Sequence, residues 1–183
     1  MQKVKEEKSA FISVMGKSLE RIEDNQHRLD NAEGYSEVWE IVKANVKQVL
    51  HKQRKGMLLF LDDMPLRLGA YHPLGTNNLV LNRTLVTIVE ATAKSRKLLN
   101  AFVYTLLLHE YLHALGYVEE AEVRPLVYQI SKNCFGGEHI AAKLAEQGPW
   151  SILRGLPLDS LRAPKRVMEI VKDFEKTNRR YIV

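Results

Sequence analysis

Residues 101–115, AFVYTLLLHEYLHAL, form an apolar run with two histidines and one glutamate near its end. An apolar stretch of this kind predicts a buried helix. His109 and His113 are four residues apart, so a helix places both imidazoles on one face, where they can bind the same metal ion. Glu110, the only carboxylate of the run, follows the first histidine directly.

This H-E-x-x-H pattern predicts a zinc site. Two histidines and a glutamate are costly to bury without partners, and one metal ion satisfies all three. Neutral imidazoles bind Zn²⁺, and a catalytic site keeps one position open for water, so we expect one Zn²⁺ per chain. Glu110 is then the candidate general base, which takes a proton from the attacking water and passes it to the leaving amine. The competing interpretation places the three side chains on the exposed face of an ordinary helix.

Length and composition indicate a globular protein with one main core. The chain has 183 residues, 45% hydrophobic and 27% charged, and its longest apolar run is too short to span a bilayer. Its single cysteine, Cys134, excludes an internal disulfide, and the first 20 residues do not have the pattern of a secretory signal. These features predict a cytoplasmic protein.

A net charge of +5 raises the question of a nucleic-acid or membrane partner. However, the basic residues are dispersed among glutamates, and the one tight basic cluster is residues 94–97. There is no aromatic interleaving and no nucleic-acid motif. We therefore expect neither nucleic acid nor a membrane as partner.

The pattern of apolar residues predicts an α+β fold. Helical periodicity covers about residues 1–33, 36–52, 83–98, 101–115, 119–134, 140–147 and 159–177. Short apolar runs predict strands at residues 57–61, 66–72 and 79–82. This order divides the chain into a helical N-terminal extension (1–55), a core (56–150) and a helical C-terminal tail (151–183).

The first predicted helix carries a heptad seam, meaning apolar residues that recur in steps of three and four. Its positions are Ile12, Met15, Leu19, Ile22, Gln26 and Leu29, with one polar break at Gln26. Such a seam can pair with a second copy of the chain, forming a homodimer, or pack back on its own domain. The sequence leaves both open.

The order of elements over residues 57–147 resembles the zincin metallopeptidases, and the chain is similar to small archaeal predicted metallopeptidases of the HEYLHALGY type. The resemblance implies a zincin-like fold, in which a small mixed or antiparallel sheet packs on the H-E-x-x-H helix. It also implies His109 and His113 as zinc ligands, Glu110 as the catalytic residue, and a peptide or protein substrate bound along an edge strand. By the order of elements, that edge strand is residues 79–82.

Three residues compete for the third ligand. Glu119 has the spacing of the metzincin pattern, although that pattern normally ends in histidine. Glu122 comes level with the metal if the two helices form a tight hairpin. His139 follows the Gly136–Gly137 break. An acidic cluster at a helix N-terminus is favoured by the helix dipole without any metal, so we favour His139.

Two functions follow from these residues. The first is a zinc metallopeptidase that hydrolyses peptide bonds with Glu110 as general base. The alternative is a catalytically silent zincin-like module that binds zinc for a regulatory or interaction role, its cleft closed by the tail. Arg124 is a candidate to orient a carboxylate at the site, or else forms an ion pair with Glu120.

Overall fold

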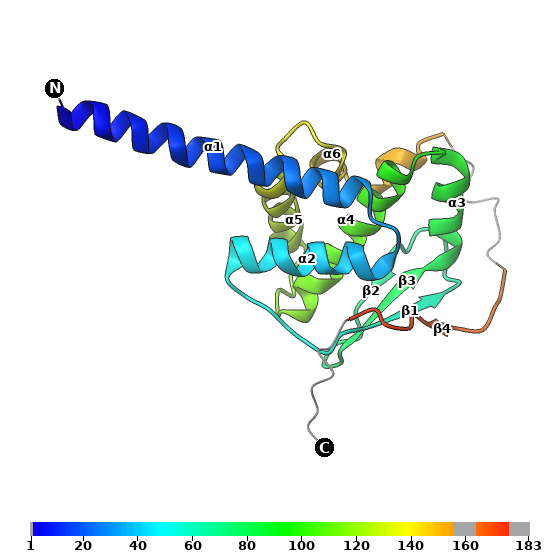
Figure 1. The fold of residues 1–183 in the computed structure, drawn as a ribbon. Coiled ribbons are helices and arrows are strands. Elements are labelled where there is room, and N and C mark those ends of the chain that lie inside the picture. The colour runs from blue at the N-terminus through cyan, green and yellow to red at the C-terminus, as the bar shows by residue number, and fades with distance from the viewer. Residues whose placement is uncertain (1, 156–163, 176–183) are drawn as a thin grey trace, which may run out of the picture.

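The computed structural model describes residues 2–155 and 164–175, with side chains from residue 15 onward. Its elements form helices around a small sheet, so the fold is α+β (Figure 1). The helices are α1 (Gln2–Asp30), α2 (Tyr35–Leu50), α3 (Arg83–Ala93), α4 (Arg96–Ala114), α5 (Glu120–Phe135), α6 (Ile140–Gln147) and the 3-10 helix η1 (Pro149–Leu153). The strands are β1 (Leu58–Asp62), β2 (Ala70–Tyr71), β3 (Asn78–Asn82) and β4 (Glu169–Ile170).

Helix α4 lies at the centre of the core. Ser95 caps its N-terminus by accepting a hydrogen bond from the backbone N–H of Leu98. The helix is apolar on nearly all sides, and its residues from 100 to 108 are all buried. Each of the five other described α-helices packs against α4. Because neighbours surround α4, it has no polar face. The H-E-x-x-H motif is therefore carried on the central, most buried helix of the core.

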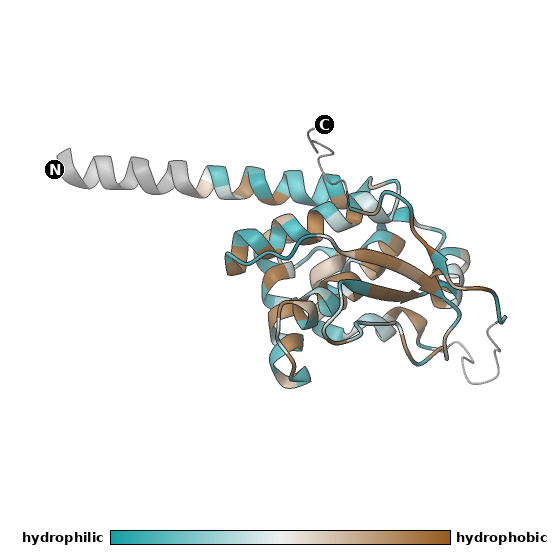
Figure 2. Cartoon of the chain, turned by 90° about the horizontal axis from the view of Figure 1, so that it is seen from below, coloured by the Kyte–Doolittle hydropathy of each residue, from teal (hydrophilic) through white to brown (hydrophobic). Residues whose placement is uncertain are grey.

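The sheet is mixed, in the order β2-β3-β1-β4. Strand β1 runs parallel to β3 and antiparallel to β4, while β2 runs antiparallel to β3. In β1, Leu59 and Leu61 are buried and the alternate residues are more exposed, as expected for a sheet with one face on the core. The strands are hydrophobic over most of their length (Figure 2).

The position of β3 corrects one expectation. Residues 79–82 were expected to form the edge strand beside the active helix. Instead β3 is paired on both sides, by β2 and by β1. The edge strand next to β3 is β2, which has two residues. It pairs with β3 on one side and with no strand of the described sheet on the other.

The C-terminal half of α1 and the whole of α2 belong to the same core as α4. Leu29 and Trp39 are fully buried in it. The polar break in the heptad seam also has a structural role, since the Gln26 side-chain amide donates to the carbonyl of Phe135 at 2.6 Å. Asn25 donates in the same way to the carbonyl of Cys134, so two amides of α1 satisfy carbonyls at the end of α5.

The tail does not form the predicted helix over its described residues. The strap, defined here as residues 164–175, contains no helix; it includes β4, which pairs with β1, and then a turn at residues 172–173. Phe174 of the strap is buried and stacks on Trp39 at 5.0 Å between ring centroids. The rest of the predicted helix, residues 159–163 and 176–177, lies outside the described residues.

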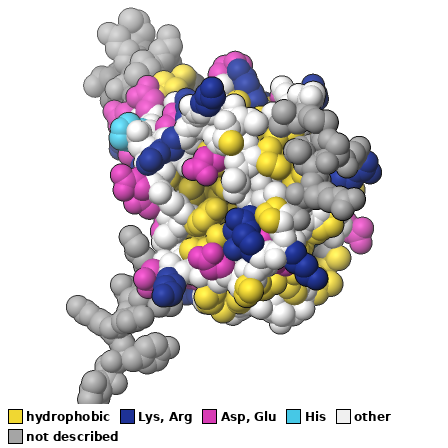
Figure 3. All heavy atoms as spheres, turned by 90° about the vertical axis from the view of Figure 1, so that its right-hand side faces the viewer, with side chains coloured by type: hydrophobic (Ala, Val, Ile, Leu, Met, Phe, Trp, Pro, Cys, Tyr) yellow, Lys and Arg dark blue, Asp and Glu magenta, His cyan; other side chains and the backbone are white. Residues whose placement is uncertain are grey.

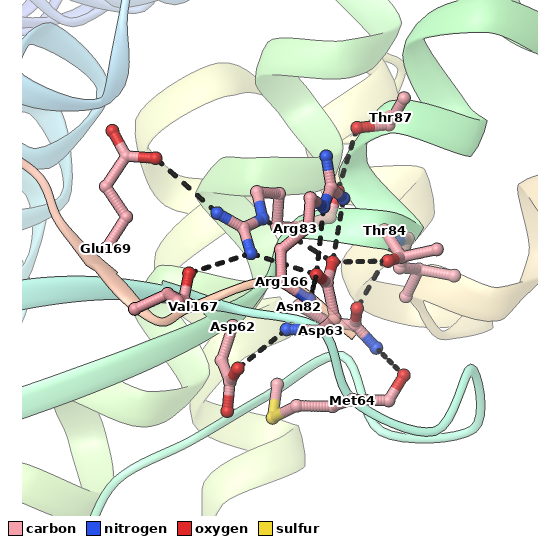
Figure 4. Close-up of polar contacts among 11 residues, drawn as sticks. Asp62, Asp63, Met64, Asn82, Arg83, Thr84, Thr87, Arg166, Val167 and Glu169 are labelled. Atoms are coloured by element: carbon pink, nitrogen blue, oxygen red, sulfur yellow. Dashed lines mark hydrogen bonds and ion pairs between the residues drawn. The ribbon is translucent and has the colours of Figure 1, made fainter. Parts of the chain in front are cut away.

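The strap begins at a buried carboxylate (Figure 4). The Asp63 side chain is 1% exposed and accepts hydrogen bonds from the guanidinium groups of Arg83 and Arg166, at 2.9 Å and 2.7 Å. The Thr84 hydroxyl donates to the same carboxylate at 2.6 Å. Asp63 thus ties the strap to the end of β1 and the start of α3.

The surface in Figure 3 carries Lys and Arg side chains interspersed with Asp, Glu and hydrophobic ones, so this face has no continuous basic area. Within residues 2–155 and 164–175, no helix combines the length and the apolar character that crossing a membrane requires.

Candidate metal site

Two imidazole nitrogens meet at the C-terminal end of α4. The Nε2 atoms of His109 and His113 are 3.2 Å apart, as expected for side chains one helical turn apart on the same face. Both residues are partly buried, while Glu110 between them is buried. The helix alone therefore brings the two predicted ligands together.

The turn after α4 sets the tautomer of His113. Gly116 has a φ of +97°, and the turn it permits places the carbonyl of Tyr117 2.8 Å from Nδ1 of His113. Because a carbonyl only accepts, Nδ1 carries the proton and donates it. In the neutral ring Nε2 then has a free lone pair, which is the form that a metal ion requires.

Glu120, the first residue of α5, completes the group. Its Oε1 lies 3.1 Å from Nε2 of His109 and 3.3 Å from Nε2 of His113. Its other oxygen, Oε2, accepts a hydrogen bond from Nε of Arg124 at 3.1 Å. Within the described part of the chain, these three residues are the set whose ligand atoms converge closely enough to hold a metal ion.

The three atoms fit zinc by distance and by chemistry. Ligands placed 2.0–2.1 Å from a tetrahedral Zn²⁺ are roughly 3.3 Å from one another, and the three separations here are 3.1–3.3 Å. Two histidines and one glutamate also form a ligand set known from catalytic zinc sites, where a fourth position is left for water. The three residues could therefore hold a metal ion and leave one position open.

His139, the predicted third ligand, lies outside the group formed by His109, His113 and Glu120. His139 is buried at the N-cap of α6, where Nδ1 accepts from the backbone N–H of Ala141 and Nε2 donates to Asp30 at 3.0 Å. Its ring stacks on Phe135 with centroids 5.1 Å apart. Burial, the largest cause, lowers the pKa of His139, and both ring nitrogens already have hydrogen-bond partners within the protein.

The other two candidates lie close to Glu120 in sequence but outside the group. Glu119 is the N-cap residue of α5, and Glu122 is exposed on the same helix. The residue of this acidic turn that the structure places beside the two histidines is Glu120, which was not among the three predicted candidates. The pairing of Glu120 with Arg124, expected as a surface ion pair, is present, and the same glutamate also faces the histidines.

Glu110 has the environment of a proton-transfer group. Its residue is 8% exposed, and burial, the largest cause, raises its pKa to about 7. A hydrogen bond from the backbone of His72 and the nearby His113 act in the opposite direction. A carboxyl group with a pKa near neutrality can both accept and return a proton under physiological conditions.

A cleft of about 690 Å³ opens over these residues. His109, Glu110 and Glu120 line it on one side. The segment 67–70, which leads into β2, lines it as well, and the remaining walls come from α5 and the region 145–150. Tyr128 also lines the cleft, whereas Tyr111 is buried with its hydroxyl bonded to the backbone of Arg54.

Comparison of the chain with protein-family models, with curated proteins and with solved structures found no match to any of the three.

Proposed function

We propose that this protein is a zinc-dependent metallopeptidase whose metal is held by His109, His113 and Glu120. The observation that carries the proposal is the convergence of their three ligand atoms within 3.1–3.3 Å, next to a buried glutamate and under a cleft. Two imidazoles, a carboxylate and an adjacent proton acceptor are the groups that metal-assisted hydrolysis requires.

Each residue has a defined task in this proposal. Zn²⁺, when bound, supplies the Lewis acid that polarises the scissile carbonyl and makes water a nucleophile near neutral pH. The Tyr117 carbonyl holds the proton of His113 on Nδ1, which keeps Nε2 available as a ligand. Arg124 fixes the orientation of the Glu120 carboxylate. Glu110 accepts the proton of the attacking water and delivers it to the leaving amine.

The position of β2 supports an extended peptide as substrate. This strand is the outermost one on its side of the sheet, and Ala70 and the residues before it line the cleft. An extended chain added to that side would hydrogen bond with the backbone of β2 and pass across the metal site. Segment 67–71 therefore takes the role that the sequence assigned to residues 79–82.

The silent-module alternative required the tail to close the cleft. The described strap lies along β1, at the edge of the sheet opposite β2. None of residues 164–175 lines the cleft, so this described part of the tail does not support the closed module.

The test compares hydrolysis of a fluorogenic peptide library by zinc-loaded wild type and Glu110→Gln. We expect a loss of roughly 10²–10⁴-fold in turnover with zinc content unchanged, because the amide cannot accept the proton. Glu122→Gln, an exposed glutamate on α5, is the matched control and retains activity. Equal turnover by Glu110→Gln and wild type contradicts the mechanism. A folded, zinc-loaded wild type that cleaves no peptide contradicts the peptidase itself and favours the silent module.

A further inference from the structure

Only the C-terminal part of the heptad seam of α1 packs against the core of its own chain. At the C-terminal end Leu29 is fully buried, and Ile22 and Gln26 are partly buried near the end of α5. One and two turns further toward the N-terminus, the same seam reaches Leu19 and Met15, which are 56% and 50% exposed. The apolar seam of α1 therefore continues along the helix past the point where its contact with the core ends.

The helix itself also continues past that point. α1 spans 29 residues, about 43 Å at 1.5 Å per residue, and its N-terminal part extends beyond the other helices (Figure 1). Most helices of this kind depend on packing of an apolar face, since an isolated helix of about 12–15 residues is marginal in water. A protruding helix with an exposed apolar seam is therefore expected to pack on a complementary partner surface.

Charge indicates which partner fits. The sequence of residues 2–17 contains four lysines and two glutamates, whereas residues 18–30 contain four acidic and two basic residues, excluding His27. The two halves of the helix are thus opposite in sign. Two copies in antiparallel orientation place the basic half of each beside the acidic half of the other, and place the open parts of the two seams together.

We infer that α1 is a dimerisation helix, which pairs antiparallel with α1 of a second copy of this chain through the seam at Met15 and Leu19. The inference is independent of the proposed enzymatic function, since it rests on the seam, its exposure and the charge of the helix. The resulting interface is small, so the dimer is expected to dissociate on dilution.

The experiment is sedimentation velocity of the full-length chain over a wide range of concentration. We compare wild type, the double variant Met15→Lys with Leu19→Lys, and Leu74→Lys. Leu74 is 73% exposed in the turn between β2 and β3 and controls for the loss of any exposed leucine. Wild type and Leu74→Lys should form a concentration-dependent dimer, and the double variant should associate at least about a hundredfold more weakly, because each dimer would hold four lysines in an apolar seam. Thermal unfolding verifies that the core of the double variant is folded.

The dependence of dimerisation on salt concentration distinguishes an antiparallel from a parallel pair of α1 helices. In an antiparallel pair, added salt screens the attraction between opposite halves and weakens the dimer, whereas a parallel pair has like halves together and is strengthened. Strengthening by salt therefore contradicts the antiparallel arrangement. A wild type that is monomeric at all concentrations, or a double variant as dimeric as wild type, overturns the inference. Binding of a monomeric wild type to vesicles of anionic phospholipid overturns it in favour of a membrane surface.

Discussion

At the scale of single residues, Glu120 links the two histidines of the candidate site to Arg124. One of its oxygens faces both histidines, and the other is held by Arg124 one turn further along α5. A carboxylate fixed at one oxygen has fewer orientations to lose when the other binds a metal ion. In the proposed site Arg124 is therefore a positioning residue, which would act on a bound metal ion through Glu120.

This arrangement predicts that Arg124→Ala weakens zinc binding by roughly 10- to 100-fold while Zn²⁺ remains bound at saturation. The affinity is measured by competition with a chromophoric chelator at fixed pH. Lys132→Ala, which removes an exposed cation from the same helix, should bind zinc as wild type does. Equal affinities in the two variants would show that Glu120 needs no support from Arg124.

The residues of α4 could be predicted because their geometry is local. Any helix places positions 109 and 113 on one face, so the sequence alone brings these two nitrogens together. The position of the Glu120 carboxylate depends on the turn at Gly116 and on how α5 is rotated about its axis relative to α4. No local sequence pattern specifies either of these. His139 was chosen as a histidine after a helix break, and its capping bond and its contact with Asp30 are visible only in the fold.

At the scale of elements, the strap shows how tertiary contacts override a helical pattern. Val167, Ile170, Val171 and Phe174 are spaced as on one face of a helix, which explains the prediction. The open edge of β1 competes for the same residues and pairs with Glu169 and Ile170. Phe174 gains a buried position against Trp39, which a helix ending in solvent would not provide.

The buried carboxylate at the start of the strap gives a prediction for stability. The Arg166 guanidinium, first, and then Arg83 and Thr84 hold the pKa of Asp63 far below its usual range, against the effect of burial. The ionised form therefore stabilises the folded state at neutral pH. Asp63→Asn should lower the free energy of unfolding by about 1.5–3 kcal/mol at pH 7, measured by urea denaturation.

The same variant tests how the contribution of Asp63 to the free energy of unfolding depends on pH. Because the folded pKa is depressed, the stabilisation is complete above the unfolded pKa, about 4, and is lost progressively as the pH falls below it. The difference in stability between wild type and Asp63→Asn should thus shrink between pH 4 and pH 2. A difference that stays constant over this range would assign the effect to packing and not to charge.

At the scale of the whole molecule, the candidate site is assembled from distant parts of one core. The ligands lie on α4 and α5, and one wall of the cleft is the segment that leads into β2. Helices α1 and α2, expected as an extension, supply Leu29 and Trp39 to that same core. Asn25 and Gln26 of α1 also donate hydrogen bonds to the C-terminal end of α5. The α+β class and most helices could be predicted from periodicity, but the order of the strands could not, because pairing between strands is not encoded in any single segment.

His109, His113 and Glu120 are proposed to bind one zinc ion. The most direct measurement is zinc content by elemental mass spectrometry after loading and desalting, for wild type, Glu120→Ala, Glu122→Ala and His139→Asn, where asparagine preserves a capping acceptor. We predict about one zinc per chain in all but Glu120→Ala, which should retain little or none. A folded wild type without zinc, or a Glu120→Ala variant that keeps its zinc while His139→Asn loses it, would contradict the account.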